Sequence, residues 1–523
     1  MNKLILKIIL PSLVWISALA YVNGQPITSR EIDSVVENTM KTFVVPGIAV
    51  ALIKDGQVIH AKGYGVRSLN TGQKVDENTL FAIASNSKAF TTTALGILVD
   101  EGKLKLDDRV IDFIPEFRLY NPYVTEEFRI RDLLTHRSGL GLGAGDLMIW
   151  PDSASFTKEE IIHNLRYMKQ VSGFRTKYDY DNLMYIVAGE IVERASGIPW
   201  EEFIEKRIME PLKMKTSAAS FSRLKDKSNV IDAHVPIAGH LQVVPRGLNE
   251  IANAAGGIYS NINDMSKWVI MHLKNGKYGE NAEKQLISEN VHEELWTPQT
   301  IIPVKGVNYY HTHFMSYGLG WRLSDVSGFK QVTHTGGLQG IVTQVTMIPE
   351  LNMGIIVFTN QQSGEAFTAI TNTIMDRYFG LPAVNWITVL HDQIMNYEAE
   401  ARKITDGVWK DAAEQHDNSY KPDLNQFIGT YQDEWLGAVQ ISLRDSVLWF
   451  ASIKSPKLCG EMIFYKGNTF IVKWRDRSMD ADAFATFALD YEGKVSGITM
   501  KAISPLTDFS YDFHDLDFHR IWN

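Results

Sequence analysis

A serine and a lysine three residues apart are the most reactive pair that the sequence offers. They are Ser85 and Lys88, in the run Ser85-Asn86-Ser87-Lys88. Residues three apart lie on one face of a helix, so the hydroxyl and the amine would be neighbours. A buried lysine amine in that position can take the hydroxyl proton and leave the serine oxygen as a nucleophile. The pair therefore predicts acyl transfer through a serine ester.

The spacing alone does not select Ser85. It also occurs in three other pairs, Ser155 with Lys158, Ser222 with Lys225, and Ser327 with Lys330. Only Ser85 follows an apolar, strand-like run, Leu80–Ala84, and opens a long amphipathic helix. There the hydroxyl would lie at the positive end of the helix, where a backbone N–H can bind an oxyanion. A serine that only caps the helix is the other interpretation of the same position.

Two further motifs follow in the chain, Tyr180-Asp181-Asn182 before a predicted helix and His334-Thr335-Gly336-Gly337 before a predicted strand. A phenolate near an ammonium group can act as a base, and an asparagine amide can donate to a substrate carbonyl. A glycine-rich strand edge exposes N–H groups to a tetrahedral oxyanion. Tyr259-Ser260-Asn261 also matches Tyr-x-Asn, and a single histidine is more often structural. The ordered set is therefore the specific signal.

The elements that must position these motifs alternate between strands and helices. Residues 47–66 hold two apolar runs around Asp55-Gly56, which predicts that the fold opens with an antiparallel hairpin. From about 86 to 290 the apolar spacing is helical. Residues 341–348 and 353–359 predict a second hairpin, followed by a helix through Tyr378. The order predicts an α+β domain whose single sheet is assembled from both ends of the sequence.

The end of the chain has a different pattern. A charged helical stretch after Leu381-Pro382 runs to about 413, and residues 415–422 have the composition of a linker. Beyond them, short alternating runs separated by turn signals, as at Asp445-Ser446 and Gly467-Asn468, predict a small barrel or sandwich. We therefore expect a hydrolase domain over 25–385, a helical linker over 386–420 and an all-β domain over 421–523.

The first 24 residues have the pattern of a secretory signal peptide. Lys3 and Lys7 precede an apolar run over residues 8–20, and small residues follow. The run is shorter than the roughly 20 residues of a spanning helix, so an uncleaved anchor is the alternative. We expect a periplasmic or secreted protein without stable membrane insertion after cleavage.

Composition excludes several classes of protein. The 523 residues are 45% hydrophobic and 22% charged, which is ordinary for a globular protein. A net charge of −9 without a basic cluster argues against nucleic acid as a partner. One cysteine, Cys459, excludes an intrachain disulfide and a multi-thiolate metal site. His311 and His313 lack a His-Glu-x-x-His context. We expect no metal and no cofactor.

The motifs and their order resemble those of the serine β-lactamase and penicillin-binding-protein superfamily, and within it the class C-like serine hydrolases. Segments 133–140, 189–197 and 254–260 are similar to that family as well, so the resemblance covers about 350 residues. It implies a β-lactamase-like fold, an antiparallel sheet flanked by helices with a helical subdomain. The run Phe427-Ile428-Gly429-Thr430-Tyr431 resembles the start of the lipocalin-like β-barrel domain that follows many of these hydrolases.

The resemblance also implies a role for each motif residue. Ser85 would form the acyl-enzyme, and Lys88 and Tyr180 would shuttle the proton. The other implied roles are substrate amide binding by Asn182, substrate binding by His334, and an oxyanion hole from the N–H groups of Ser85 and Gly337. His334 stands where lactamases and transpeptidases usually carry lysine, and a neutral imidazole offers less positive charge to a substrate carboxylate. In this it is similar to the family's esterases and D-amino-acid peptidases.

These observations predict an exported serine hydrolase that acts through an acyl-enzyme on small ester or amide and peptide substrates, of esterase or D-amino-acid peptidase type. A β-lactamase or a penicillin-binding D-Ala-D-Ala carboxypeptidase is the nearest alternative. A non-catalytic cell-wall or ligand-binding protein is the alternative of another class, and it would predict a damaged motif, whereas all three motifs are intact. The expected partner is a small-molecule or short-peptide substrate.

Overall fold

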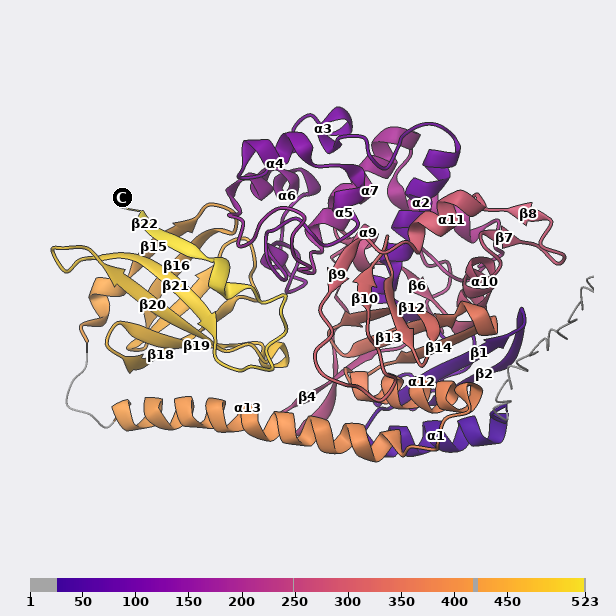
Figure 1. The fold of residues 1–523 in the computed structure, drawn as a ribbon. Coiled ribbons are helices and arrows are strands. Elements are labelled where there is room, and N and C mark those ends of the chain that lie inside the picture. Colours follow the sequence, from indigo (N-terminus) through magenta and orange to yellow (C-terminus); the bar gives the residue numbers. More distant parts are fainter. Residues whose placement is uncertain (1–25, 248, 417–421, 522–523) are drawn as a thin grey trace, which may run out of the picture.

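The computed structural model describes residues 26–247, 249–416 and 422–521. The predicted signal peptide, residues 1–24, lies outside the described residues. Among the helices of the described part, none is both long and apolar enough to cross a membrane. A body of sheet and helices and a smaller β-barrel stand side by side, and one long helix runs beneath both (Figure 1).

The first domain is built on an antiparallel sheet of eight strands. In spatial order the strands are β2 (Gln57–Gly65), β1 (Gly47–Lys54), β14 (Met353–Thr359), β13 (Ile341–Ile348), β12 (Phe329–Leu338), β11 (Arg322–Val326), β10 (Met315–Tyr317) and β9 (Thr300–Ile302). The pairing of β1 with β14, with Ile48 opposite Thr359, joins the two ends of the domain's sequence. The sheet is therefore assembled from both ends, as the sequence predicts.

Strand β1 is apolar from Gly47 to Ile53 because helices cover both of its faces. Ala49 and Ala51 belong to the core shared with the helical subdomain, while Val50 and Leu52 belong to a second core on the other face. Alternate residues of a strand point to opposite faces, so a strand buried on both sides loses the polar alternation. The second face is covered by α1 (Ser29–Thr42) and α12 (Gly364–Phe379).

The helical subdomain lies against the first face of the sheet (Figure 1). Its longer helices are α2 (Ser87–Asp100), α7 (Leu183–Ser196) and α10 (Ile262–Leu273). The shorter ones are α3 (Val110–Phe113), α4 (Pro122–Glu127), α5 (Ile130–Leu133), α6 (Lys158–Asn164), α8 (Trp200–Ile204), α9 (Asn253–Gly256) and α11 (Glu289–Leu295). Short two-stranded pairs link them: β3 (Phe81–Ala82) with β6 (Tyr259–Ser260), β4 (Ala233–Ile237) with β5 (His240–Val244), and β7 (Lys277–Tyr278) with β8 (Lys284–Gln285).

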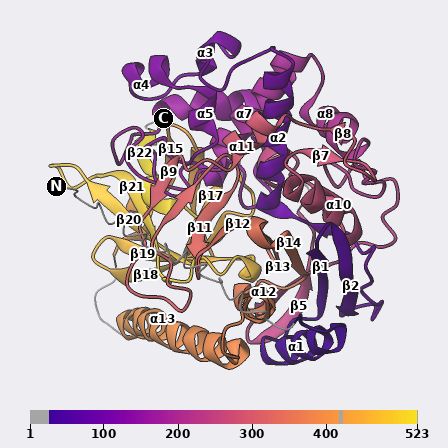
Figure 2. The ribbon, with the colours of Figure 1, turned by 45° about the vertical axis from the view of Figure 1, so that its right-hand side comes forward.

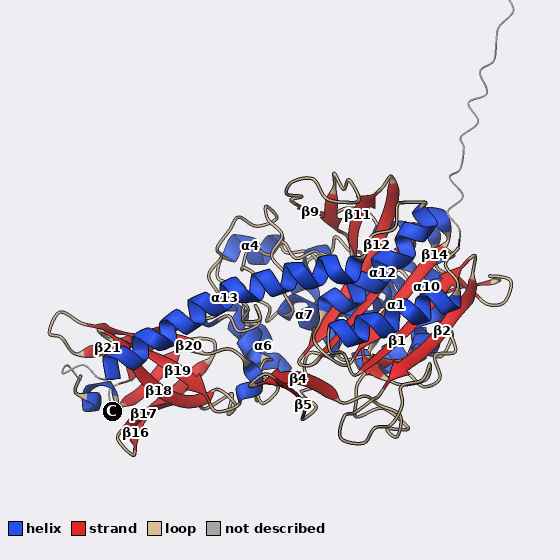
Figure 3. Ribbon diagram, turned by 90° about the horizontal axis from the view of Figure 1, so that it is seen from below, coloured by secondary structure: helices blue, strands red, loops and turns tan. Residues whose placement is uncertain are grey.

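The expectation that the fold opens with strands is wrong, because α1 precedes the first hairpin. A capping box starts this helix: Glu31 N–H donates to Thr28 Oγ1 over 3.2 Å, and Thr28 N–H donates to the Glu31 carboxylate over 2.8 Å. Ile32 and Val36 then bury one face of α1 in the second core. Figure 3, the view from below, shows α1 and α12 lying over the second face of the sheet.

The second domain is a closed antiparallel barrel of eight strands. The strands follow sequence order: β15 (Gly429–Asp433), β16 (Gly437–Arg444), β17 (Val447–Ser452), β18 (Cys459–Lys466), β19 (Thr469–Trp474), β20 (Ala483–Leu489), β21 (Val495–Ala502) and β22 (Asp517–Ile521). Closure pairs β22 with β15 and removes the free edges. The fold class expected from the sequence, a β-lactamase-like domain followed by a small all-β barrel, is confirmed.

Helix α13 (Trp386–His416) connects the two domains and packs on both (Figures 2 and 3). At its start, Trp386 Nε1 donates to Asp376 Oδ2 of α12 over 2.7 Å. Near its end, Ala412 and Trp409 pack with Ile471 on the outside of the barrel. The helix thus acts as a strut between the domains.

The barrel also contacts the helical subdomain directly. Asn164 Nδ2 donates to Trp435 O over 2.9 Å, and the Lys454 ammonium pairs with Glu160 over 2.7 Å. With α13 below and these contacts at the side, the barrel is held at two places. Its loops can therefore lie in fixed positions against the first domain.

Candidate active site

Ser85 lies in a short 3-10 turn, Ala84–Asn86, that leads directly into α2. Ala84 has φ 49°, a left-handed conformation that costs a residue with a Cβ about 1–3 kcal/mol and is kept only where neighbours enforce it. Two contacts hold the turn: Asn86 Nδ2 donates to Thr343 Oγ1 over 2.9 Å, and the N–H of Ile258 donates to Ser87 Oγ over 3.1 Å. The residues around Ser85 are buried, while Ser85 itself is partly exposed and lines a pocket.

Lys88 is fully buried one helical turn along from Ser85. Its Nζ lies 3.2 Å from Ser85 Oγ, and it donates to Asn182 Oδ1 over 2.7 Å and to Ala255 O over 3.0 Å. Burial lowers the pKa of Lys88 to about 7, although nearby carboxyl groups oppose the shift. A neutral amine keeps two hydrogens, which Asn182 and Ala255 accept, so its lone pair faces the Ser85 hydroxyl. The arrangement fits proton abstraction from Ser85.

Tyr180 is buried beside the same pair, but its environment does not favour a phenolate. Desolvation raises the pKa of Tyr180, and a hydrogen bond with Ser85 only partly opposes this. The Lys88 Nζ lies over the ring, 4.8 Å from its centroid. The neutral phenol can pass a proton, whereas the amine is the group whose pKa lies near neutrality. Because burial lowers the pKa of Lys88 and raises that of Tyr180, it favours Lys88 of the two candidate bases.

Asn182 has both ends of its amide engaged. Its Oδ1 accepts from Lys88, and its Nδ2 donates to Asp146 Oδ2 over 2.8 Å. Asp146 is fully buried, and desolvation raises its pKa to about 8. Asp181 is buried next to Asn182, and desolvation raises its pKa to about 7. Sequence reasoning missed Asp146, because no periodicity or motif connects it to Ser85 or Asn182.

His334 lies on β12 as a neutral imidazole. Its Nδ1 lies 2.7 Å from Thr335 O, which can only accept, so Nδ1 carries the hydrogen. Its Nε2 therefore accepts from the Tyr317 hydroxyl over 2.8 Å. Burial lowers the pKa of His334 well below its ordinary value. The ring lines the pocket without charge, and both of its nitrogens are used inside the protein.

The two glycines after His334 bring the strand edge to the serine. A Cβ on Gly336 would lie 2.2 Å from Ile83 O and 2.9 Å from Ala84 Cβ, so only glycine allows this approach. A Cβ on Gly337 would meet nothing within 4 Å, and Gly337 is exposed along the pocket. The edge of β12 thus runs beside the turn that carries Ser85.

Arg322 of β11 is a pocket residue that sequence reasoning missed. It has no carboxylate partner within salt-bridge distance among the described residues, and its one hydrogen bond, to Tyr178 Oη, is long at 3.5 Å. Its Nε is buried without a partner. A guanidinium stays charged at all ordinary pH values. The pocket therefore contains the fixed positive charge that His334 does not supply.

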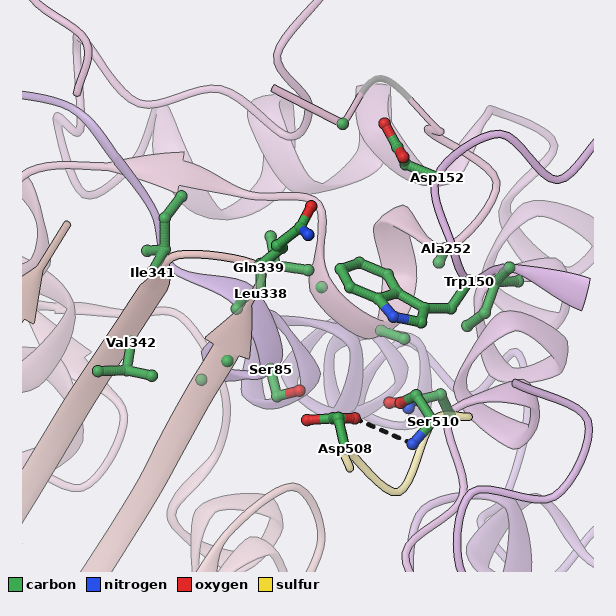
Figure 4. Close-up of a pocket in the computed structure, with 18 of the residues that line it drawn as sticks. Ser85, Trp150, Asp152, Ala252, Leu338, Gln339, Ile341, Val342, Asp508 and Ser510 are labelled. Carbon is green, nitrogen blue, oxygen red and sulfur yellow. Dashed lines mark hydrogen bonds between the residues drawn. The ribbon is translucent and has the colours of Figure 1, made fainter. Parts of the chain in front are cut away.

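The barrel forms one wall of the pocket through the segment before β22. Asp508, Phe509, Ser510 and Tyr511 all line it. The Phe509 ring stands against Tyr180, with 5.8 Å between ring centroids. Ser510 Oγ donates to Asp146 Oδ2 over 2.8 Å. Figure 4 shows Ser85 and Asp508 in the same pocket, with Asp508 accepting from the N–H of Ser510 over 2.9 Å.

The pocket has a volume of about 550 Å³, enough for a short peptide or a drug-sized molecule. Beyond the motif residues, Trp150 and Asp152 line it on the side of the helical subdomain, and Gln339 lies near Ile341 on the side of the sheet (Figure 4). The motif residues from three separate parts of the sequence and a loop from the barrel therefore face one cavity.

The competing Ser-x-x-Lys pairs have other contacts. Lys158 pairs with Glu190 over 2.5 Å, Ser222 Oγ donates to Glu250 over 2.7 Å, and Lys330 Nζ donates to Trp296 O over 3.1 Å. Tyr259 lies on β6 at the pocket wall and packs on Phe221, 5.4 Å between ring centroids.

The His311 and His313 pair lies on an exposed loop, where the His313 ring faces Asp325 at 3.4 Å. In the parts of the chain that the structure describes, no three His, Cys, Asp or Glu side chains are grouped to hold a metal ion.

The chain is similar to several known proteins. A family model described as Beta-lactamase matches residues 32–377, and one described as a domain of unknown function (DUF3471) matches residues 415–520. The chain is 26% identical over 392 residues to "Unguisins hydrolase ungD" of Aspergillus violaceofuscus. The aligned region covers 70% of this chain and 68% of that protein. It is 25% identical over 342 residues to "Protein flp" of Staphylococcus aureus strain MW2, covering 64% of each.

Among solved structures, the octameric penicillin-binding protein homologue from Pyrococcus abyssi has a similar fold. The TM-score is 0.59 at 22% identity, over 94% of this chain and all of that one. The similarity therefore extends over both domains as a likeness of fold.

Proposed function

Because the chain belongs to the beta-lactamase family, we propose that it is a serine hydrolase that acts through an acyl-enzyme on small ester or amide and peptide substrates. The observation that carries the proposal is the pair at the head of α2. Ser85 Oγ is 3.2 Å from the amine of a fully buried Lys88, whose pKa burial lowers to about 7. A base with a pKa near neutrality is half deprotonated there, which suits general base catalysis.

The proposed reaction follows from the contacts of that pair. Lys88 takes the Ser85 proton as the serine oxygen attacks the substrate carbonyl carbon, and the carbonyl electron pair moves to oxygen. The N–H groups of Ser85 and Gly337 stabilise that oxyanion. As the carbonyl re-forms, the bond to the leaving group breaks, and Lys88 returns the proton to it through the Tyr180 hydroxyl. Water then repeats the sequence on the Ser85 ester and releases the acid.

The charges on the pocket wall suggest what the substrate carries. The exposed carboxylate of Asp508 is suited to a substrate amine, which supports an esterase or a D-amino-acid peptidase type. Arg322 supports a second candidate, a D-Ala-D-Ala carboxypeptidase type, because a guanidinium without a carboxylate partner is suited to a substrate carboxylate.

A substrate panel tests the proposal and separates the two candidates. Wild type and Ser85→Ala would be assayed on p-nitrophenyl esters, D-amino-acid amides, D-Ala-D-Ala peptides and nitrocefin. We expect Ser85-dependent turnover of the esters and of at least one peptide class. Turnover that survives in Ser85→Ala would contradict the acyl-enzyme. A preference for substrates with a free carboxylate would favour the carboxypeptidase type.

Export also belongs to the proposal. It rests on the pattern of residues 1–24, which lie outside the described residues. Sequencing the amino terminus of the mature protein should find a start near residue 21 or 25. A mature protein that still begins at Met1 would remove this part of the proposal.

A further inference from the structure

We propose that Ser510 of the barrel is a positioning residue for the Lys88 base and acts on it through Asp146 and Asn182. The inference rests on the proposed function, since it takes Lys88 as the base for Ser85. It assigns the barrel a part in the chemistry, in addition to a wall of the pocket.

The contacts form a continuous chain between the two domains. Ser510 Oγ donates to Asp146 Oδ2 over 2.8 Å, and Asn182 Nδ2 donates to the same oxygen, also over 2.8 Å. Asn182 Oδ1 then accepts from Lys88 Nζ over 2.7 Å. All these bonds are short and involve buried or half-buried groups. The barrel hydroxyl is thus three hydrogen bonds from the catalytic amine.

A second barrel residue fixes the backbone that carries Asp146. Asp512 is fully buried, and its carboxylate accepts from the N–H of Gly145 over 2.6 Å and from the N–H of Leu147 over 3.2 Å. These N–H groups flank Asp146 at the start of the 3-10 turn Asp146–Met148. The position of the Asp146 side chain therefore depends on the docked barrel segment.

The position of Asp146 in turn sets the orientation of the Asn182 amide. Oδ2 of Asp146 accepts from Asn182 Nδ2 whether or not Oδ1, which has no partner, carries a proton. It therefore holds Nδ2 on its own side and leaves the Asn182 Oδ1 facing Lys88. If the amide turned over, its NH₂ group would face the amine, and the Lys88 lone pair would lose its direction toward Ser85. Ser510 shares the acceptor oxygen with Asn182 and so keeps Asp146 in place.

This series of hydrogen bonds from Ser510 to Lys88 also affects the charge near Lys88. The ionisable groups that act on Asp146 are Lys88, Asp181 and Asp512, from α2, the Tyr-Asp-Asn segment and the barrel. The hydrogen bonds from Ser510 and Asn182 both favour the ionised form of Asp146. Without Ser510, Asp146 would be protonated more readily, and its attraction for the Lys88 ammonium would weaken. The pKa of Lys88 would then fall further.

The test measures the rate at which a fluorophosphonate, a serine-directed covalent probe, labels Ser85 as a function of pH. Wild type, Ser510→Ala, Ser510→Thr and Ser504→Ala would be compared in the full chain. Ser504 is the matched control, because its hydroxyl accepts only a turn hydrogen bond from the N–H of Leu506, over 3.1 Å.

In Ser510→Ala we expect labelling at the pH optimum to slow by roughly five- to tenfold, the loss of about one hydrogen bond. We also expect the rising limb of the profile to move to lower pH by roughly half a unit. Ser510→Thr should recover both values, and Ser504→Ala should match wild type. An Ala variant with an unmoved limb would overturn the proposal, because lost packing alone does not shift that limb.

An Asp146→Asn background gives a second test of the path. If Ser510 acts through Asp146, adding Ser510→Ala there should have little further effect on the pH profile. A full additional shift would overturn the route through Asp146. Should Ser510→Ala fail to fold, Ser510→Cys, close in size but a weak donor, replaces it with the same expectations. A wild type that never labels at Ser85 contradicts the proposed function itself, a result distinct from those above.

Discussion

The two walls of the pocket that face each other across Ser85 are built in different ways. On one side the Ser85 turn, Lys88 and Asn182 belong to the first domain and are pinned by buried hydrogen bonds. On the other side the segment 508–511 comes from the barrel, more than 400 residues after Ser85, and Phe509 remains 39% exposed. Rigid groups shielded from solvent determine the pKa values of the catalytic side chains, while exposed loop residues determine which substrates fit the pocket. The first wall, together with Ser510 of the barrel, should govern the chemistry, and the other residues of the second wall the choice of substrate.

The largest effect should come from the nucleophile. Ser85→Ala is expected to lower turnover by about 10³- to 10⁶-fold with the fold intact, because no other group can form the ester. Steady-state kinetics and circular dichroism would measure this, with Ser155→Ala as the control that keeps activity. A covalent serine probe that labelled Ser155, Ser222 or Ser327 in place of Ser85 would contradict the assignment.

The next effect separates the two candidate bases on the same wall. Lys88→Ala should lower kcat by about 10³-fold or more, and Tyr180→Phe by roughly 10- to 100-fold, since the general base matters more than a relay hydroxyl. The double variant should be little worse than Lys88→Ala, because the two groups act on one proton. Fully additive losses in this kinetic cycle would argue for independent roles.

The pH profile of the wild type provides a matching test of the base. Lys88 must be neutral to accept a proton, and its pKa is lowered to about 7. Activity should therefore rise with pH through about 7. The rise should disappear in Lys88→Ala. A rising limb that stayed near the ordinary lysine or tyrosine pKa, about 10, would count against the desolvated amine as the base.

A smaller effect concerns substrate charge. Arg322→Ala should lower kcat/KM for a carboxylate-bearing peptide by about 10- to 100-fold, since a charge-assisted hydrogen bond contributes about 1.5 to 3 kcal/mol. A neutral p-nitrophenyl ester should be affected much less. Arg246→Ala is the matched control, because that pocket arginine already lies 3.4 Å from Asp232. Equal losses on both substrates would exclude Arg322 from carboxylate recognition.

The smallest effect should come from the barrel wall. Phe509→Ala removes a ring that stands against Tyr180, and an aromatic pair of this kind contributes about 0.5 to 1.5 kcal/mol. We expect KM to change by roughly two- to tenfold, differently for each substrate, with kcat for a small ester nearly unchanged. Tyr491→Ala, at a barrel tip where the ring is 99% exposed, is the control. A uniform loss of kcat in Phe509→Ala would indicate that the barrel contributes to the chemical step through Phe509 as well as through the hydrogen bonds of Ser510.

Much of the fold was predictable because its signals are local. The hairpin of β13 and β14 has the bounds that the apolar runs indicate, 341–348 and 353–359, with the turn between them. The alternating short runs after residue 427 became barrel strands. Helix α1 was missed, although Thr28 and Glu31 form a capping box. Its few apolar residues stand among polar ones, so the pattern is a weaker signal than the apolar hairpin that follows.

The residues of the candidate site also divide into those with a local sequence signal and those without one. The side chains of Ser85, Lys88, Tyr180 and Asn182 and the backbone of Gly337 all reach one pocket or its base, and each stood in a motif that could be recognised in the sequence. Arg322, Asp146 and Ser510 stood in no motif. Their importance comes from neighbours 36 to 364 residues away, for which a single sequence has no periodicity.

By itself the sequence determined the chemistry that is available: a serine one helical turn from a lysine, a Tyr-x-Asn before a helix, and glycines where a strand must pass the nucleophile. Only the tertiary structure decided how those groups are charged. Burial brings Lys88 toward neutrality and keeps His334 uncharged, while Arg322 stays charged and the barrel hydroxyl of Ser510 reaches Asp146. The physical reason is that pKa values and donor directions depend on the solvent that is excluded and on the groups packed nearby, and residues distant in sequence supply both.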